Sequence, residues 1–247
     1  MKKDFRIIAM VFSVLVLVIA LGFSSCKKDK EEEPEPTPQS TWYSPAPGEN
    51  GTLPTQVLPS RLYDAVTEYF TVNTGENPPE VYGEFVSSPH MLIYTTVHND
   101  TVSVYNDRYI AFFRNNEYVD FFGQQWDDDY NEYYEEAYRK LYVIGEGENF
   151  TCYYLTEGYP DGMYAKFSTI FSGNWNEELG GLGNFQVAVI LLETSGNPNL
   201  APVNSFRVLG DGDGLAQDTA WIDDKRGAFG GLKEVSAEDA FRMFRVK

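Results

Sequence analysis

Cysteine and histidine are scarce in this chain, with two of each among its 247 residues. A Ser-His-Asp arrangement would need His90 or His98, and no Gly-x-Ser-x-Gly elbow accompanies either of them. If His90 and His98 lay on one strand, their side chains would stand about 27 Å apart, too far to share a metal or a substrate. No repeat of 20 to 50 residues marks a repeat architecture. The sequence therefore carries no catalytic signature of these kinds.

Basic residues are also few: the chain has 19 of them and 37 acidic residues, so its formal net charge is −18. Such a surface repels the phosphates of nucleic acids and the anionic headgroups of membranes. The charge balance therefore disfavours nucleic acid as a partner. It equally disfavours electrostatic docking on a membrane.

The longest apolar run lies at the amino end. Lys2, Lys3 and Arg6 form a positive head, residues 7–22 are apolar, and small residues follow. The run is shorter than the roughly 20 residues that a spanning helix needs. A positive head, a short apolar core and small residues before a cleavage point are the parts of a secretory signal peptide.

A cysteine stands where cleavage is expected, in Phe23-Ser24-Ser25-Cys26, and the charged stretch Lys28-Asp29-Lys30-Glu31-Glu32 follows. This pattern resembles the lipobox and export stretch of Bacteroidota-type surface lipoproteins. The resemblance implies that residues 1–25 are removed and that Cys26 carries a lipid such as palmitate. It also implies an outer-membrane lipoprotein on the cell surface, held to the membrane through that lipid. An uncleaved apolar anchor, with Cys26 as a bystander, is the alternative.

Residues 26–56 are rich in proline and glutamate and show no apolar periodicity. Such a composition buries too little apolar surface to offset the entropy of ordering, so we predict a disordered tether. The alternative is that Trp42 and Tyr43 pack against the domain and shorten the tether. Residues 57–247 are long enough for one globular domain with a large core.

Within this domain the hydrophobic period is mostly two, with many Tyr, Phe, Val, Ile and Thr residues, which is typical of strands. The predicted fold is mainly β: a single antiparallel barrel or sandwich of about 8–10 strands. The predicted strands are residues 81–86, 91–97, 109–114, 117–123, 141–144, 150–155, 163–171, 185–193 and 205–209.

Three helices are expected around these strands. An N-terminal helix is predicted over Pro59–Thr71, and a short inserted acidic helix is predicted over Trp126–Tyr142, where apolar residues recur with a 3.6 period. A C-terminal helix is predicted over Ala237–Arg245, preceded by a capping-box pattern. The helix before a first strand bearing Gly83-Glu84-Phe85 resembles the lipocalin architecture, and no function is carried across from it.

The glycine-rich segment Gly210–Gly214 follows a predicted strand and holds two carboxylates. It does not fit a dinucleotide loop, since Leu215 stands where the third glycine belongs. Asp211, Asp213 and Asp218 are hard oxygen ligands, so Ca²⁺ is a candidate cofactor. A solvated glycine-rich turn is the alternative.

Aromatic residues are abundant, with 17 Tyr, 17 Phe and 4 Trp. Their densest cluster is a candidate ligand-binding surface, because tyrosines beside acids stack on sugars and hold cationic or peptide partners. The alternative is that half of the cluster packs inward. Its members are Trp126, Tyr130, Tyr133, Tyr134 and Tyr138.

These features favour a lipid-anchored extracytoplasmic protein that acts by binding rather than by catalysis. The expected ligand is a glycan, a peptide or an envelope protein. One alternative is a carbohydrate-processing hydrolase with two carboxylates about 5–9 Å apart. Another is a structural or adhesive envelope component. Cys152, in an aromatic strand-like run, is expected to be a small buried hydrophobic residue rather than a nucleophile.

Overall fold

The structure, a computed structural model, describes residues 41–219 apart from 99, 101, 116, 117, 129, 130, 177 and 179. All of them belong to one compact unit, Pro38–Lys247. The predicted signal peptide, Cys26, the first part of the tether, Tyr130 and the predicted C-terminal helix lie outside the described residues.

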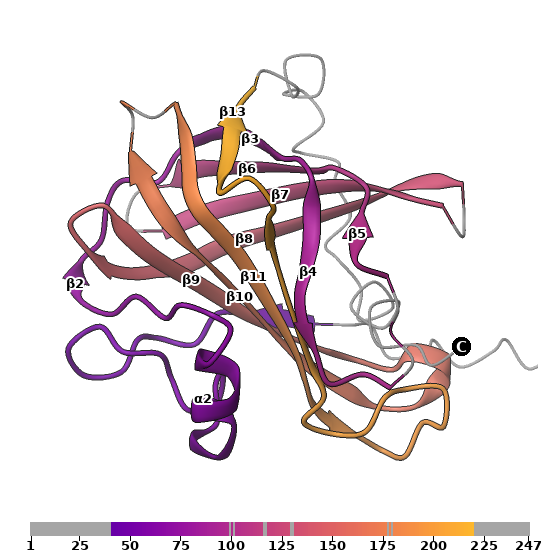
Figure 1. The fold of residues 1–247 in the computed structure, drawn as a ribbon. Coiled ribbons are helices and arrows are strands. Elements are labelled where there is room, and N and C mark those ends of the chain that lie inside the picture. Colours follow the sequence, from indigo (N-terminus) through magenta and orange to yellow (C-terminus); the bar gives the residue numbers. More distant parts are fainter. Residues whose placement is uncertain are drawn as a thin grey trace, which may run out of the picture. The chain divides into compact units, whose positions relative to one another are not determined.

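Eight antiparallel strands close into a barrel (Figure 1). Each strand pairs with the next around the barrel, and β13 completes the ring by pairing with both β11 and β3. The prediction of a mainly β domain is confirmed, and of its two alternatives the barrel is correct. In order around the ring the strands are β3 (Gly83–Ser87), β6 (Arg108–Asn115), β7 (Tyr118–Asp127), β8 (Glu132–Glu146), β9 (Asn149–Gly158), β10 (Ala165–Asn176), β11 (Gly181–Thr194) and β13 (Leu215–Asp218).

Five further strands extend this ring. β12 (Phe206–Asp211) pairs with β11 and with β4 (His90–Thr95), and β4 in turn pairs with β5 (Val104–Tyr105). β2 (Glu76–Asn77) runs parallel to β8. β1 (Thr41–Tyr43) pairs with β9, so part of the segment predicted as tether belongs to the folded domain.

On one side of the barrel the wall is covered on both of its faces, so β9 and β11 are buried along almost their whole length. Successive residues of a strand point to opposite faces. In β9, Cys152 and Tyr154 therefore join the interior cluster, while Tyr153 and Leu155 join an outer one. All eight barrel strands contribute to the interior cluster through Phe85, Phe112, Phe121, Tyr138, Tyr154, Phe171, Phe185 and Ala216.

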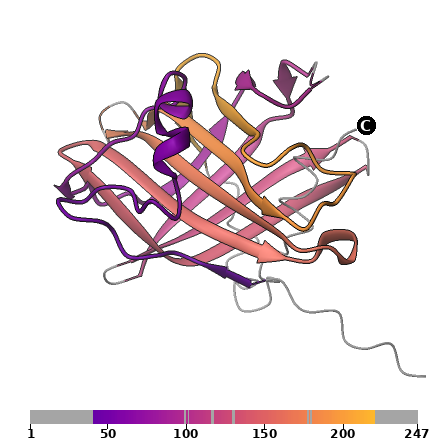
Figure 2. The same ribbon diagram turned by 90° about the horizontal axis from the view of Figure 1, so that it is seen from below.

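The outer face of this wall is covered by α2 (Ser60–Thr67), the predicted N-terminal helix in a shorter form (Figures 1 and 2). Leu62 and Val66 lie four residues apart, so both face the wall and are buried. Burial of each contributes about 1.5–3 kcal/mol. Phe70 is packed in the same cluster after the helix ends.

The inserted acidic helix predicted over Trp126–Tyr142 is wrong, because β7 and β8 occupy those residues. A β-bulge explains the error. The pairing between β7 and β8 shifts between Val119 and Phe121, and Lys140 adopts a positive φ of 59° on the opposite strand. Tyr138 and Leu141 therefore both reach the interior although they are three residues apart. That spacing imitates a helical period.

Candidate functional site

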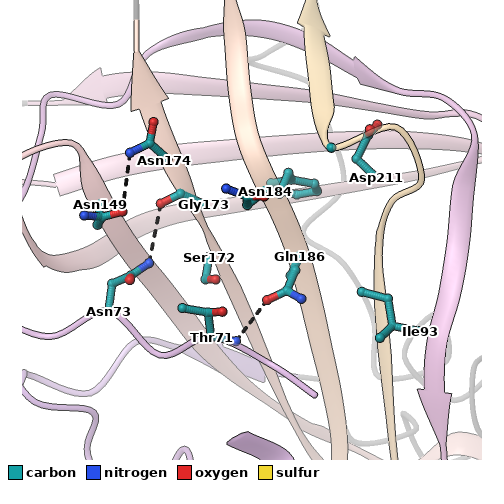
Figure 3. A pocket seen from close by; sticks show the side chains of 12 residues that line it. Thr71, Asn73, Ile93, Asn149, Ser172, Gly173, Asn174, Asn184, Gln186 and Asp211 are labelled. Atoms are coloured by element: carbon teal, nitrogen blue, oxygen red, sulfur yellow. Dashed lines mark hydrogen bonds between the residues drawn. The ribbon is translucent and has the colours of Figure 1, made fainter. Parts of the chain in front are cut away.

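A pocket of about 260 Å³ lies on the outer face of the wall (Figure 3). Strands β10 and β11 form its floor, and the segment that follows α2 forms one side. The pairing of β10 with β11 shifts between Ser172 and Asn174, which interrupts the regular ladder at this point. The lining residues include Thr71, Asn73, Ile93, Asn149, Ser172, Gly173, Asn174, Asn184, Phe185, Gln186, Asp211 and Gly214.

Side-chain amides hold the wall of the pocket in place. Gln186 accepts a hydrogen bond from the Thr71 N–H at 2.9 Å and donates to the Tyr69 carbonyl at 3.3 Å. Asn73 donates to the carbonyl oxygens of Phe150 and Gly173, at 2.9 and 3.4 Å. These bonds fasten the segment after α2 onto the barrel, so the pocket is formed before any ligand arrives.

Ser172 lies at the floor of the pocket and is 1% exposed. Within the described part of the chain its hydroxyl has no hydrogen-bond partner. A buried polar group without a partner costs about 1–3 kcal/mol, so native structures seldom keep one without a reason. Its position at the floor points to a partner that comes from outside the protein.

Asn184 is exposed at the rim of the pocket with a φ of 50°. Its backbone N–H donates to the Gly214 carbonyl at 2.9 Å, which fixes the residue against the loop between β12 and β13. Asparagine tolerates this left-handed conformation better than most residues. The arrangement leaves the amide side chain facing the pocket.

Asp211 clamps the loop between β12 and β13. Its carboxylate accepts from the N–H groups of Ser88, Asp213 and Leu215 at 3.1, 3.2 and 3.0 Å. Burial raises the pKa of Asp211, and its contact with Asp213 acts in the same direction. The hydrogen bond with Asp211 lowers the pKa of exposed Asp213.

The described residues do not include a cluster of ligands that would support the calcium hypothesis. Among the described residues, no group of three or more His, Cys, Asp or Glu side chains could hold a metal ion. Asp211 and Asp213 interact directly, whereas Asp218 lies in β13 and does not complete such a group. The glycine-rich segment acts as a hydrogen-bonded turn.

A buried polar network lies behind this loop. His90 is fully buried, and its Nδ1 lies 3.0 Å from the Ser87 hydroxyl. Burial lowers the pKa of His90 to about 3, with the charge of Arg108 acting in the same direction. Arg108 pairs with Glu136, and both side chains are buried.

The predicted aromatic cluster is divided between the two faces of the wall. Trp126 and Tyr133 form an edge-to-face pair with ring centroids 5.0 Å apart, and Tyr133 is 53% exposed. Tyr138 lies in the core and stacks on Tyr154 at 3.6 Å. Tyr134 lies in β8. Of the described side chains, Tyr133 is therefore exposed and Tyr138 is in the core, because alternate positions of a strand face opposite ways.

The remaining candidate catalytic residues of the sequence are Cys152, His90 and His98. Cys152 is fully buried in the interior cluster, and burial raises the pKa of its thiol well above the usual range. This fits the expected small hydrophobic residue. His90 begins β4, whereas His98 lies in an exposed turn after the strand has ended at Thr95. The structure thus gives the two histidines different environments.

No known protein family, curated protein or solved structure matches the chain. None of the helices in the described part of the chain has the length and apolar character needed to cross a bilayer. What the protein does must therefore be inferred from its own residues.

Sequence reasoning missed the pocket itself. Its amides come from four separate segments, and none belongs to a spaced motif. One local pattern was visible: asparagines occur near the ends of strands in β9, β10 and β11, where turn geometry also favours asparagine. Only the closed barrel brings these strand ends together.

Proposed function

We propose that the protein is a lipid-anchored extracytoplasmic binding protein, and that the amide-lined pocket is its ligand site. The amino-terminal residues support the anchor, since a signal-like run ends at Cys26 before an acidic stretch. The lipid on Cys26 holds the protein at the outer membrane. The barrel then presents the pocket outside the cytoplasm.

The observation that carries the binding site is the unpartnered, buried hydroxyl of Ser172 at the floor of the pocket. A ligand that hydrogen-bonds to this oxygen removes the cost of its burial. The hydrogen bonds of Gln186 and Asn73 keep the pocket open around it. A preformed site of this kind loses little entropy on binding.

Binding is favoured over hydrolysis at this site. A glycosidase needs two carboxyl groups about 5–9 Å apart across the sugar. Asp211 is the one carboxylate among the described lining residues, and its oxygens already accept three hydrogen bonds from backbone N–H groups. A structural envelope component would need no such pocket.

Two experiments test this proposal. Radiolabelled palmitate should enter the wild-type protein and fail to enter Cys26→Ala; equal labelling of both would contradict the anchor. A thermal-shift screen against mixed saccharides and peptides should find ligands that stabilise the wild type more than Ser172→Ala. A screen in which every ligand stabilises both proteins equally would contradict the site.

A further inference from the structure

The structure assigns a chemical class to the ligand: we infer that the pocket binds one ring of a neutral saccharide. This inference depends on the proposed function, because it concerns the same pocket. It selects among the glycan, peptide and protein ligands that the sequence left open. Four observations support it.

The first observation is the chemistry of the lining. Five of the lining side chains are neutral amides, and hydroxyls come from Thr71 and Ser172. An amide offers both donors and an acceptor, and a hydroxyl does the same on a smaller scale. Sugar hydroxyls need this mixture, since each one donates and accepts. The amide side chains belong to Asn73, Asn149, Asn174, Asn184 and Gln186.

The second observation is the charge of the lining. None of the described lining residues is a lysine, arginine or histidine, so an anionic ligand finds no counter-charge. The one carboxylate, Asp211, is engaged by the N–H groups of Ser88, Asp213 and Leu215. Three of its roughly four lone-pair sites are therefore occupied, and a cationic ligand gains little from it. A neutral ligand fits best.

The third observation concerns main-chain hydrogen bonds. Extended peptides bind most often by adding a strand to an exposed sheet edge. β10 is paired with β9 on one side and with β11 on the other. β11 is likewise paired with β10 and with β12. No free edge lies along the floor, so a peptide would find side chains alone.

The fourth observation is size and shape. Because a cavity of about 150 Å³ accommodates benzene, the 260 Å³ of this pocket accommodate roughly ten non-hydrogen atoms, or about one sugar ring. Ile93 is 44% exposed at the edge of the pocket and supplies an apolar surface. The C–H face of a sugar ring can pack against it while the hydroxyls meet the amides.

The test uses the full mature lipoprotein, purified in a detergent without a sugar headgroup. Saturation-transfer NMR and calorimetry measure glucose, galactose, mannose and N-acetylglucosamine as neutral probes. Glucuronate, glucosamine and trialanine are the anionic, cationic and peptide probes. We expect at least one neutral sugar to bind, and to bind more tightly than its charged counterparts.

Two matched pairs of variants place the binding in this pocket. Ser172→Ala removes the floor hydroxyl, and Ser168→Ala removes another buried, unpartnered hydroxyl on the same face of β10, outside the pocket. Asn184→Gly removes an amide at a positive φ, and Asn50→Gly does so at an exposed position elsewhere.

Ser172→Ala and Asn184→Gly should each weaken sugar binding by about 3- to 10-fold, which is the loss of one neutral hydrogen bond. Ser168→Ala and Asn50→Gly should leave the affinity unchanged. If trialanine or glucuronate binds in a Ser172-dependent way while neutral sugars do not, the saccharide inference is overturned and the proposed site stands. If no probe shows Ser172-dependent binding, both are overturned.

Discussion

The amide-lined pocket and the buried network behind it meet at Asp211, which lines the pocket and pairs with His90 between β12 and β4. They are nevertheless built from different kinds of polar group. The pocket offers neutral amides and hydroxyls. The network contains the buried ion pair Arg108–Glu136 together with His90. A buried charge is costly unless it is paired, whereas a neutral group is tolerated at much lower cost. The network should therefore govern stability, and the pocket should govern binding.

The largest effect is expected from breaking the buried ion pair. Glu136→Ala leaves the Arg108 guanidinium buried without its partner, which should lower the free energy of unfolding by about 3–5 kcal/mol. Urea unfolding monitored by circular dichroism measures the loss. The exposed pair Arg114–Glu80 provides the control, and Glu80→Ala should cost no more than about 1 kcal/mol. Similar losses in the two variants would contradict the comparison.

The next effect is a pH dependence centred on His90. The pKa of His90 is about 3 in the folded protein and about 6.5 in the unfolded chain. Between these values the unfolded chain binds a proton that the folded protein does not. The free energy of unfolding should therefore fall by up to about 1.4 kcal/mol for each pH unit below 6.5, until pH 3 is reached.

Urea unfolding at a series of pH values measures this slope. His90→Gln should show a shallower slope than the wild type between pH 6.5 and 3. His98→Gln is the control, since His98 is exposed. Parallel slopes for the wild type and His90→Gln would show that His90 is not the group responsible.

A smaller effect is expected from Asp211, which links the two regions. Asp211→Asn replaces one carboxylate oxygen with an amide group that cannot accept from the Ser88 N–H. The free energy of unfolding should fall by about 1.5–3 kcal/mol, as for hydrogen bonds to a charged group. Asp213→Asn should cost less, because exposed Asp213 accepts from Leu215 alone among the backbone groups. A larger loss of stability in Asp213→Asn than in Asp211→Asn would show that Asp211 does not clamp the loop.

The smallest effect on stability is expected in the pocket. Ser172→Ala and Ser168→Ala each delete a buried hydroxyl that has no partner in the described structure. Since no hydrogen bond is lost and the cost of burying the hydroxyl is removed, the unfolding free energy of neither variant should fall below that of the wild type. Differential scanning calorimetry compares the two variants. A large loss in Ser172→Ala alone would assign this serine a structural role.

The barrel could be predicted from the sequence because its wall repeats a simple period. β9 and β11 are buried on both faces, and their runs of apolar and aromatic residues therefore predict strands that are covered on both sides. The prediction for β8 was wrong because the bulge at Lys140 shifts the alternation of inward-facing and outward-facing side chains by one residue. Thr41–Tyr43 was included in the predicted tether because the residues around it are rich in prolines and acids, and pairing with β9 overrides that composition. The alternative that Trp42 and Tyr43 pack against the domain is correct.

The pocket could not be predicted for a different reason. In the sequence, Ser172 looks like any other strand residue. The lack of a hydrogen-bond partner for its hydroxyl among the described residues can be recognised only once the neighbouring strands are placed. The aromatic cluster was more conspicuous in the sequence, yet Tyr138 is used in the core. Local density of aromatic residues does not distinguish a surface from an interior when the side chains alternate.

The most direct test of the account follows the side-chain amide signals of asparagine and glutamine by NMR as a neutral saccharide is added. The signals of Asn174, Asn184 and Gln186 should shift together and saturate with one dissociation constant. Those of Asn50 and Asn199, which do not line the pocket, should stay unchanged. Saturating shifts at Asn50 or Asn199, with none at the pocket amides, would contradict the assignment of this pocket as the ligand site.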